Sequence, residues 1–312
     1  MASMIKKTLY FGNPAYLSLS NKQLVIQRPE DGDFPYSNSE KIIRTISIED
    51  IGIVVLDNRQ ITITSGLLAE LLGNNVAVIT CTPESMPQGL LLPLEGNTLQ
   101  NERFLTQIEA SLPLKKQLWQ QTVSSKIRNQ ALTLKYITGS DFPNMIAWSN
   151  AVRSGDPDNL EGRAAAYYWR NIFPEVQFFV RGQDEAPPNN LLNYGYAILR
   201  AVIARALVSS GLLPTLGIHH HNRYNAYCLA DDIMEPYRPY VDRLVYDICN
   251  VSGNWSPDLT TLIKSQLLQI PAIDVEIDGK RSPLMVAATT TSASLFRCFN
   301  GNSKKVLYPT MI

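Results

Sequence analysis

The 312-residue sequence has few residues of several kinds, and each shortage excludes a class of protein. Its four cysteines lie far apart with no CxxC pair, which argues against structural zinc and a disulfide framework and predicts reduced core thiols: Cys81, Cys228, Cys249 and Cys298. No apolar run is long enough to span a bilayer, and no signal peptide is recognisable. We therefore expect a cytoplasmic protein that does not associate with a membrane.

Charge is also scarce and evenly balanced. Charged residues make up 18% of the chain and the formal net charge is zero, whereas a nucleic-acid-binding protein usually has a basic excess. The first hundred residues carry 7 Lys+Arg and 10 Asp+Glu, and the remainder carries 21 and 18. Any contact with DNA must therefore depend on local basic patches in the second part. With 45% apolar residues, the chain can bury two domain cores.

The first hundred residues have the pattern of short β-strands separated by turns. Alternating apolar positions predict strands at 8–11, 16–19, 24–27, 45–48, 52–56, 60–64, 76–80 and 90–94. A short helix that Ser65 could cap and Gly73 could end interrupts them. Such close spacing favours a sandwich or rolled sheet over a parallel sheet with crossover helices.

From residue 99 to about 269 the apolar spacing becomes helical, with breaks at glycine- and proline-containing segments. A late strand at 275–277 and a last helix at 282–299 complete the pattern. We predict an α+β protein with an N-terminal β-rich, sandwich-like domain at 1–97 and a larger all-α catalytic domain at 98–312. Met1-Ala2-Ser3, before Met4, resemble a remnant of an expression vector.

All three histidines are consecutive, at His219, His220 and His221, where the chain leaves a helix. Glu235 follows fifteen positions after His220, and Asp232 lies three positions before Glu235, so both carboxylates would share a helix face. Imidazole and carboxylates together suit a hard divalent cation such as Mg²⁺ or Mn²⁺. Alternatively, the histidines cover a surface turn and the acids favour a helix N-terminus.

Two further segments have polar residues at helix starts. Glu161 follows Asp156, which could cap a helix, and Pro157, which suits the first turn. Asn193 belongs to a second helix that begins near Asn189. A dipole-complementing surface acid and an ordinary capped helix explain these residues equally well.

Four ordered motifs together resemble the integrase of CRISPR adaptation, the universal spacer-acquisition protein, in its type II form. These motifs are EGRAAAYYW at 161–169, NLLNYGYAIL at 190–199, LGIHHHN at 216–222 and LADDIMEPYRP at 229–239. Their order and separation, and the β-then-helical organisation, are similar to the family along nearly the whole chain.

The resemblance implies a site of three metal-binding catalytic residues, Glu161, His220 and Glu235, with Mg²⁺ or Mn²⁺. His220 is chosen because the family's histidine lies three positions after a glycine, here Gly217. The third ligand is an aspartate in some branches, and glutamate resembles the type II form. Supporting residues are expected at Asp232, Asn193 and Arg238, and DNA-contacting arginines at Arg163, Arg223 and Arg238.

The implied reaction inserts short double-stranded DNA fragments into a CRISPR repeat. A 3′-hydroxyl attacks a repeat phosphodiester and another 3′-oxygen leaves, so no nucleotide cofactor is needed, in agreement with the absence of GxxxxGK[ST]. Two alternatives stay open: a metal-dependent endonuclease that does not join, and a catalytically silent DNA-binding assembly subunit. We expect alanine at any of the three site residues to abolish joining and leave the fold intact.

The resemblance also implies partners. They are a second copy of the chain, paired through the β-rich domain, and a small ferredoxin-like adaptation protein whose dimer is flanked by two such homodimers. An association with the type II effector nuclease, in a bacterial cytoplasm, is compatible with the same form.

Overall fold

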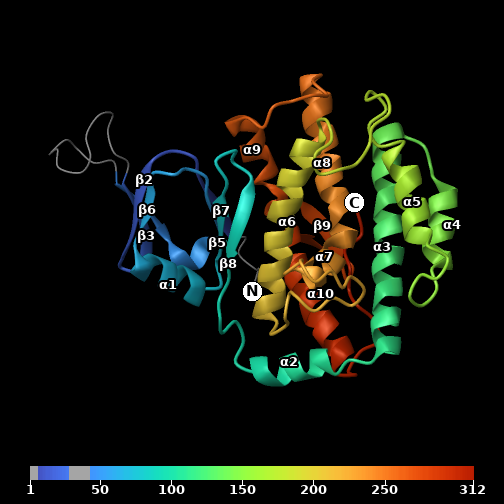
Figure 1. Ribbon diagram of the computed structural model, residues 1–312, viewed down its shortest axis with the longest axis horizontal. Helices are drawn as coiled ribbons and strands as arrows, with labels where there is room; N and C mark the ends of the chain where they lie inside the picture. The colour runs from blue at the N-terminus through green and yellow to red at the C-terminus, as the bar shows by residue number, and fades with distance from the viewer. Residues whose placement is uncertain (1–5, 28–42) are drawn as a thin grey trace. The chain divides into compact units, whose positions relative to one another are not determined.

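A computed structural model describes residues 6–27 and 43–312 of the chain. The chain divides into two compact units, Met1–Gly96 and Asn97–Ile312, so the division falls one residue before the predicted boundary (Figure 1). The expected vector remnant at Met1-Ala2-Ser3 lies outside the described residues. The first unit is rich in strands and the second is mainly helical, as the sequence predicts.

Two four-stranded sheets form the first unit. In one, three parallel strands are followed by an antiparallel one, in the order β1 (Lys7–Phe11), β5 (Ile51–Leu56), β7 (Ala77–Cys81) and β8 (Pro87–Leu91). In the other, the order is β4 (Ile43–Ser47), β3 (Gln23–Gln27), β2 (Ala15–Ser20) and β6 (Ile61–Ile63), with only β2 and β6 parallel.

The sequence favours a sandwich or rolled sheet over a parallel sheet with crossover helices, and within the two sheets some neighbouring strands are nevertheless parallel. The β1-to-β5 connection contains strands β2, β3 and β4 of the other sheet and the 3-10 helix η1 (Ile48–Asp50), and the β5-to-β7 connection contains β6 and helix α1 (Ser65–Gly73). Such long connections let strands of one sheet run in the same direction. Both sheets and α1 contribute to one apolar core, which includes Leu17, Leu24, Ile51, Leu67 and Val78.

The second unit contains nine α-helices among its residues, all of which the structure describes. Their bounds are α2 (Gln100–Ile108), α3 (Leu112–Thr138), α4 (Pro143–Ala151), α5 (Leu160–Trp169), α6 (Asn189–Ser209), α7 (Cys228–Met234), α8 (Arg238–Ser252), α9 (Thr261–Leu267) and α10 (Leu284–Phe299). Two 3-10 helices and a hairpin complete it: η2 (Glu235–Tyr237), η3 (Ile270–Ala272), β9 (Asp274–Ile277) and β10 (Lys280–Pro283).

Helix α6 is the centre of this unit. It packs against α7, α8 and α10, and fifteen of its side chains are buried. By length and composition alone α6 could cross a membrane, but 78% of its apolar window is buried inside the protein. That burial identifies α6 as a core helix.

Helix α3 is the longest of the unit and positions the candidate site. Ser111 accepts a hydrogen bond from the Leu114 N–H at its N-terminus, and Gly139, with φ of 71°, ends it. Its buried face packs against α4, α5, α8 and η2 (Figure 1). Residues from two distant parts of the chain, α4–α5 and η2–α8, therefore pack against α3.

Candidate metal-dependent active site

The local capping of α5 fixes the position of Glu161. Asn159, rather than the predicted Asp156, is the N-cap, and its side chain accepts from the Gly162 N–H. Asp156 instead accepts from the N–H groups of Leu160 and Glu161 at 3.0 and 2.9 Å. Pro157 precedes the helix and is not in its first turn, because the loop needs an extra residue for Asp156 to reach back.

The regular helix is interrupted at the Glu235 segment. Regular helix α7 ends at Met234, η2 begins at Glu235, and α8 begins at Arg238, because Pro236 and Pro239 cannot donate the hydrogen bonds of a continuous helix. On α3, Asn129 Nδ2 donates to the Pro236 carbonyl at 2.8 Å. This bond ties the turn that carries Glu235 to the helix beside it.

A single ammonium group joins the two glutamates. Lys126 Nζ on α3 lies 2.7 Å from Glu161 Oε1 and 2.6 Å from Glu235 Oε2. The two carboxylate oxygens are consequently no farther apart than the sum of these distances. The Lys126 and Glu235 side chains are 12% and 8% exposed and that of Glu161 is 21% exposed, so the cluster is shielded but not sealed.

Charges across this cluster compensate one another. Burial opposes the charge of Lys126, but Glu235 and Glu161 outweigh it and raise the pKa of the ammonium. Burial alone would raise the pKa of Glu235, but Arg238 and Lys126 lower it below its ordinary value. Arg238 Nε lies 2.9 Å from Glu235 Oε1, so each oxygen of Glu235 faces a cation.

The histidine loop is organised by a fully buried carboxylate. Asp232 Oδ2 accepts from the backbone N–H groups of Ile218 and His219 at 2.8 and 2.9 Å. Its Oδ1 lies 2.5 Å from His220 Nδ1. An ionised carboxylate only accepts hydrogen bonds, so Nδ1 carries a proton, and in the neutral imidazole Nε2 keeps its lone pair. Asp232 therefore orients the imidazole of His220, and its supporting role in a metal site stays a prediction.

The three histidines have different environments. His219 stacks on Trp119 of α3, with ring centroids 4.1 Å apart, and burial followed by the neighbouring His220 lowers its pKa. The hydrogen bond to Asp232 raises the pKa of His220, and the charges of Glu235 and Glu161 add to the increase. His221 is exposed. His220 is thus the histidine that is oriented by a carboxylate and lies within electrostatic reach of both glutamates.

The donor types present suit a divalent ion, but the described residues contain no group of three His, Cys, Asp or Glu side chains placed to hold one, so the metal site stays a prediction. Two converging carboxylates already hold a cation, the Lys126 ammonium. The half-exposed imidazole of His220 lies within electrostatic reach of both carboxylates. Oxygen donors with one nitrogen match the preference of Mg²⁺ or Mn²⁺.

The other predicted residues are more scattered. Asn193 accepts from Arg181 and donates to the Gln183 carbonyl, each at 2.8 Å, so it organises the segment before α6. Its supporting role in the site stays a prediction. Arg238 supports Glu235 and its guanidinium lies 4.7 Å above the Tyr196 ring, which commits it to the protein more than to DNA.

Of the three arginines predicted to contact DNA, two are exposed. The Arg163 guanidinium lies 4.7 Å over the Trp148 ring, and that of Arg223 lies 4.6 Å over the Tyr224 ring. Both retain solvent-accessible charge in the helical unit, so contact with DNA stays a prediction for them.

Lys126 and Trp119 are the residues that sequence reasoning missed. Both lie on the buried face of α3, with Leu118, Val123 and Ile127 as apolar neighbours. A lysine within an apolar helical stripe needs a buried anionic partner. That requirement was the signal that could have identified Lys126.

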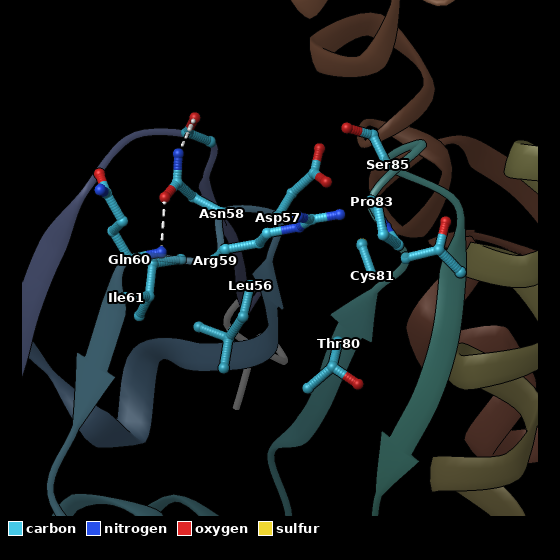
Figure 2. A pocket seen from close by; sticks show the side chains of 12 residues that line it. Leu56, Asp57, Asn58, Arg59, Gln60, Ile61, Thr80, Cys81, Pro83 and Ser85 are labelled. Carbon is cyan, nitrogen blue, oxygen red and sulfur yellow. Dashed lines mark hydrogen bonds between the residues drawn. The ribbon is translucent and has the colours of Figure 1, made fainter.

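A separate pocket of about 650 Å³ lies in the first unit, at the carboxyl ends of β5 and β7 (Figure 2). Its polar groups bond to one another: Asp57 accepts from Tyr10 at 2.6 Å, and Asn58 bonds to the Gly12 carbonyl and the Gln60 N–H. None of the predicted site residues lines this pocket.

The fold and this acidic cluster define a two-unit protein with a buried carboxylate pair and an oriented histidine in its helical unit. The family model of CRISPR associated protein Cas1 matches residues 9–258. The CRISPR-associated endonuclease Cas1 of Neisseria meningitidis serogroup C (strain 8013) is 34% identical over 99% of this chain and 97% of its own length. The chain belongs to the Cas1 endonuclease/integrase family of CRISPR adaptation.

Solved structures share the fold at lower identity. A casposase bound to integration product has a TM-score of 0.77 at 20% identity, covering 96% of this chain and 92% of its own. A Cas6-RT-Cas1–Cas2 complex has a TM-score of 0.69 at 19% identity, covering 98% of this chain and 36% of that chain. A TtCas1–DNA complex has a TM-score of 0.63 at 17% identity, covering 93% and 92%.

Proposed function

We propose that the protein is a divalent-metal-dependent integrase that inserts short double-stranded DNA fragments into a CRISPR repeat. The observation that carries this proposal is the convergence of Glu161 and Glu235 on one cation, beside a histidine whose Nδ1 is held by Asp232. Family membership and the casposase with its integration product support joining over hydrolysis alone.

The chain's own groups account for most of the chemistry. Glu161 and Glu235 would supply oxygen ligands and His220 Nε2 a nitrogen ligand, and the bound ion would supply Lewis-acid activation of the phosphodiester and of the attacking hydroxyl. Asp232 keeps the proton on His220 Nδ1, so that Nε2 stays available as a ligand or as an acceptor of the hydroxyl proton.

The reaction exchanges one phosphodiester for another. The 3′-oxygen of the fragment forms a bond to the repeat phosphorus while the bond from that phosphorus to the repeat 3′-oxygen breaks. The number of phosphodiester bonds is unchanged, so no nucleotide energy source is needed. In the ion-free protein Lys126 and Arg238 neutralise the two glutamates, and the bound ion would neutralise them during the reaction.

DNA, a second copy of the chain and a small adaptation protein are the proposed partners, with Mg²⁺ or Mn²⁺ as cofactor. Solved relatives with DNA and in a complex that includes Cas2 support the first and third of these. Dimerisation through the first unit, an association with the type II effector nuclease and a cytoplasmic location stay predictions.

A joining assay tests the proposal. The full chain, with its adaptation partner, is incubated with Mn²⁺, a fragment with free 3′-hydroxyls and a supercoiled repeat plasmid. Joined products are expected, and none with 3′-dideoxy ends. Nicked plasmid alone would favour the hydrolytic alternative, and no reaction with either substrate would favour the silent assembly subunit.

Variants of the three site residues test where the reaction occurs. For Glu235, a glutamine variant replaces the alanine variant. Glu161→Ala and His220→Ala are expected to reduce joining at least about 100-fold while the fold is retained, and His221→Ala is the matched control. Glu235→Ala is unsuitable, because it would leave Arg238 without its carboxylate partner and Lys126 with Glu161 alone, at a stability loss of about 3–5 kcal/mol. Glu235→Gln preserves the volume and is the better test.

A further inference from the structure

Lys126 occupies the gap that the proposed ion needs. Its ammonium contacts one oxygen of Glu161 and one of Glu235, at 2.7 and 2.6 Å. The other oxygen of Glu235 faces Arg238 at 2.9 Å. Both oxygens of Glu235 are therefore already engaged, and a divalent ion can bind there only if one of the two cations moves away.

The two cations differ in how readily they can move. The Arg238 guanidinium lies over the Tyr196 ring at 4.7 Å and is held in place by that contact. Lys126 reaches the carboxylates from α3 on a flexible four-carbon stem. The backbone below it is fixed, because Asn129, three residues further along α3, bonds to the Pro236 carbonyl. Lys126 Nζ is thus the mobile cation of the cluster.

The net charge of the cluster also depends on where the Lys126 ammonium lies. With Lys126 and Arg238 in place, the charges of the Glu161 and Glu235 carboxylates are cancelled, and a divalent ion gains little net attraction. Moving the Lys126 ammonium out restores a net negative pair. Without Lys126, the two carboxylates would repel each other in the ion-free protein.

We propose that Lys126 is a positioning residue that holds Glu161 and Glu235 facing each other in the ion-free protein and competes with the divalent ion for them. This inference rests on the proposed metal site. It assigns the ion a binding step in which one ammonium leaves both carboxylates and no covalent bond changes.

Binding of Mn²⁺ to the DNA-free full chain tests the competition. Calorimetric titration is compared for wild type, Lys126→Gln and Lys126→Arg. Lys126→Gln removes the competing charge and is expected to lower the dissociation constant for Mn²⁺ about tenfold or more. Lys126→Arg keeps the charge and is expected to bind Mn²⁺ no more tightly than wild type. Lys135→Gln, on the exposed side of the same helix, is the matched control and is expected to bind like wild type.

A measurement on the wild-type protein avoids dependence on variant folding. Amine-reactive labelling of Lys126, quantified by mass spectrometry, is compared in EDTA and in saturating Mg²⁺. Displacement of the ammonium from both carboxylates is expected to increase its labelling several-fold, with Lys135 labelling unchanged. Equal labelling at saturating ion would overturn the competition even if no Lys126 variant folds.

The Mn²⁺ titrations distinguish a wrong role for Lys126 from a wrong metal site. If wild type binds Mn²⁺ and Glu161→Gln does not, but Lys126→Gln binds no more tightly than wild type, the role of Lys126 is overturned and the metal site stands. If wild type and Glu161→Gln bind Mn²⁺ equally, the proposed site itself is wrong.

Discussion

Gly217 lies where any side chain would collide with the turn that carries His220. A Cβ at this position would be 2.3 Å from the His220 carbonyl oxygen and 2.9 Å from Asp232 Oδ2. We expect Gly217→Ala to displace the loop, to lower the free energy of unfolding by about 1–3 kcal/mol and to reduce joining. Urea denaturation and the joining assay measure the two effects.

Gly73 provides the control for that substitution. It lies at the end of α1, and an added Cβ would meet nothing within 4 Å. Gly73→Ala should keep both stability and joining. If Gly217→Ala behaves the same way, the loop tolerates displacement and the close approach has no role in positioning His220.

Asp242 is a buried carboxyl whose protonation should affect stability. It accepts hydrogen bonds from Tyr168, at 2.9 Å, and from Tyr196, yet burial raises its pKa to about 6. Because the folded-state pKa of Asp242 lies above its ordinary value, the protonated carboxyl stabilises the fold. This contribution to the free energy of unfolding is complete below about pH 4 and is lost as pH rises through 6. Asp242→Asn should therefore gain on the order of 3 kcal/mol relative to wild type between about pH 4 and pH 7.

Urea denaturation across that range measures the difference. Asp141→Asn, at an exposed position of the same unit, is the control and should show no comparable trend. A difference between Asp242→Asn and wild type that is independent of pH would mean that Asp242 stays ionised in the folded protein.

At the residue scale, the sequence could predict side chains whose chemistry is visible in a motif. Glu161 and Glu235 contact the same ammonium, and both influence the charge of His220, whereas the joint site that the resemblance implied stays a prediction. Lys126 belongs to no such motif, and its role depends on which face of a 27-residue helix turns toward the other elements. Asn193 lies in a matching motif, but its partners are set by the loop before α6, which no motif specifies.

At the scale of secondary-structure elements, one carboxylate of α7 holds the histidine loop in place. Asp232 of α7 accepts two loop backbone N–H groups and holds His220 Nδ1. We expect Asp232→Asn to lower the free energy of unfolding by about 1–3 kcal/mol, because the amide oxygen of asparagine accepts hydrogen bonds more weakly than the buried carboxylate. The pKa of His220 should fall toward its ordinary value.

The sign of the accompanying pH effect follows from the raised pKa. The His220–Asp232 interaction stabilises the fold below the ordinary histidine pKa, and this stabilisation is lost as pH rises through the folded-state value. Histidine NMR titration of wild type, Asp232→Asn and the neighbouring Asp231→Asn measures the shift. An unchanged His220 titration in Asp232→Asn would rule out the hydrogen bond as its cause.

Element positions were predictable where local chemistry sets them. Proline fixed the end of α7 at Met234, and Gly139 ends α3. The parallel pairing of β1, β5 and β7 was not predictable from strand patterns, because strand direction depends on how long connections pass through the other sheet. The N-cap of α5 is Asn159 and not the predicted Asp156, because both residues can cap a helix and lie in the same loop.

At the scale of the whole molecule, the first unit is predicted to pair two copies of the chain. Its sheets end in edge strands β1, β8, β4 and β6 among the described residues, and unpaired edges readily join a second chain. Light scattering of the full chain should give twice the monomer mass. A fragment of residues 97–312 should be monomeric, and a dimeric fragment would move the interface to the helical unit.

A crystal structure soaked in Mn²⁺, with anomalous scattering recorded, tests the central account most directly. We predict one Mn²⁺ peak at bonding distance from Glu161, Glu235 and His220 Nε2, with the Lys126 ammonium displaced from both carboxylates. A fully soaked crystal in which the three side chains bind no ion, or in which Mn²⁺ binds elsewhere in the helical unit, would contradict it.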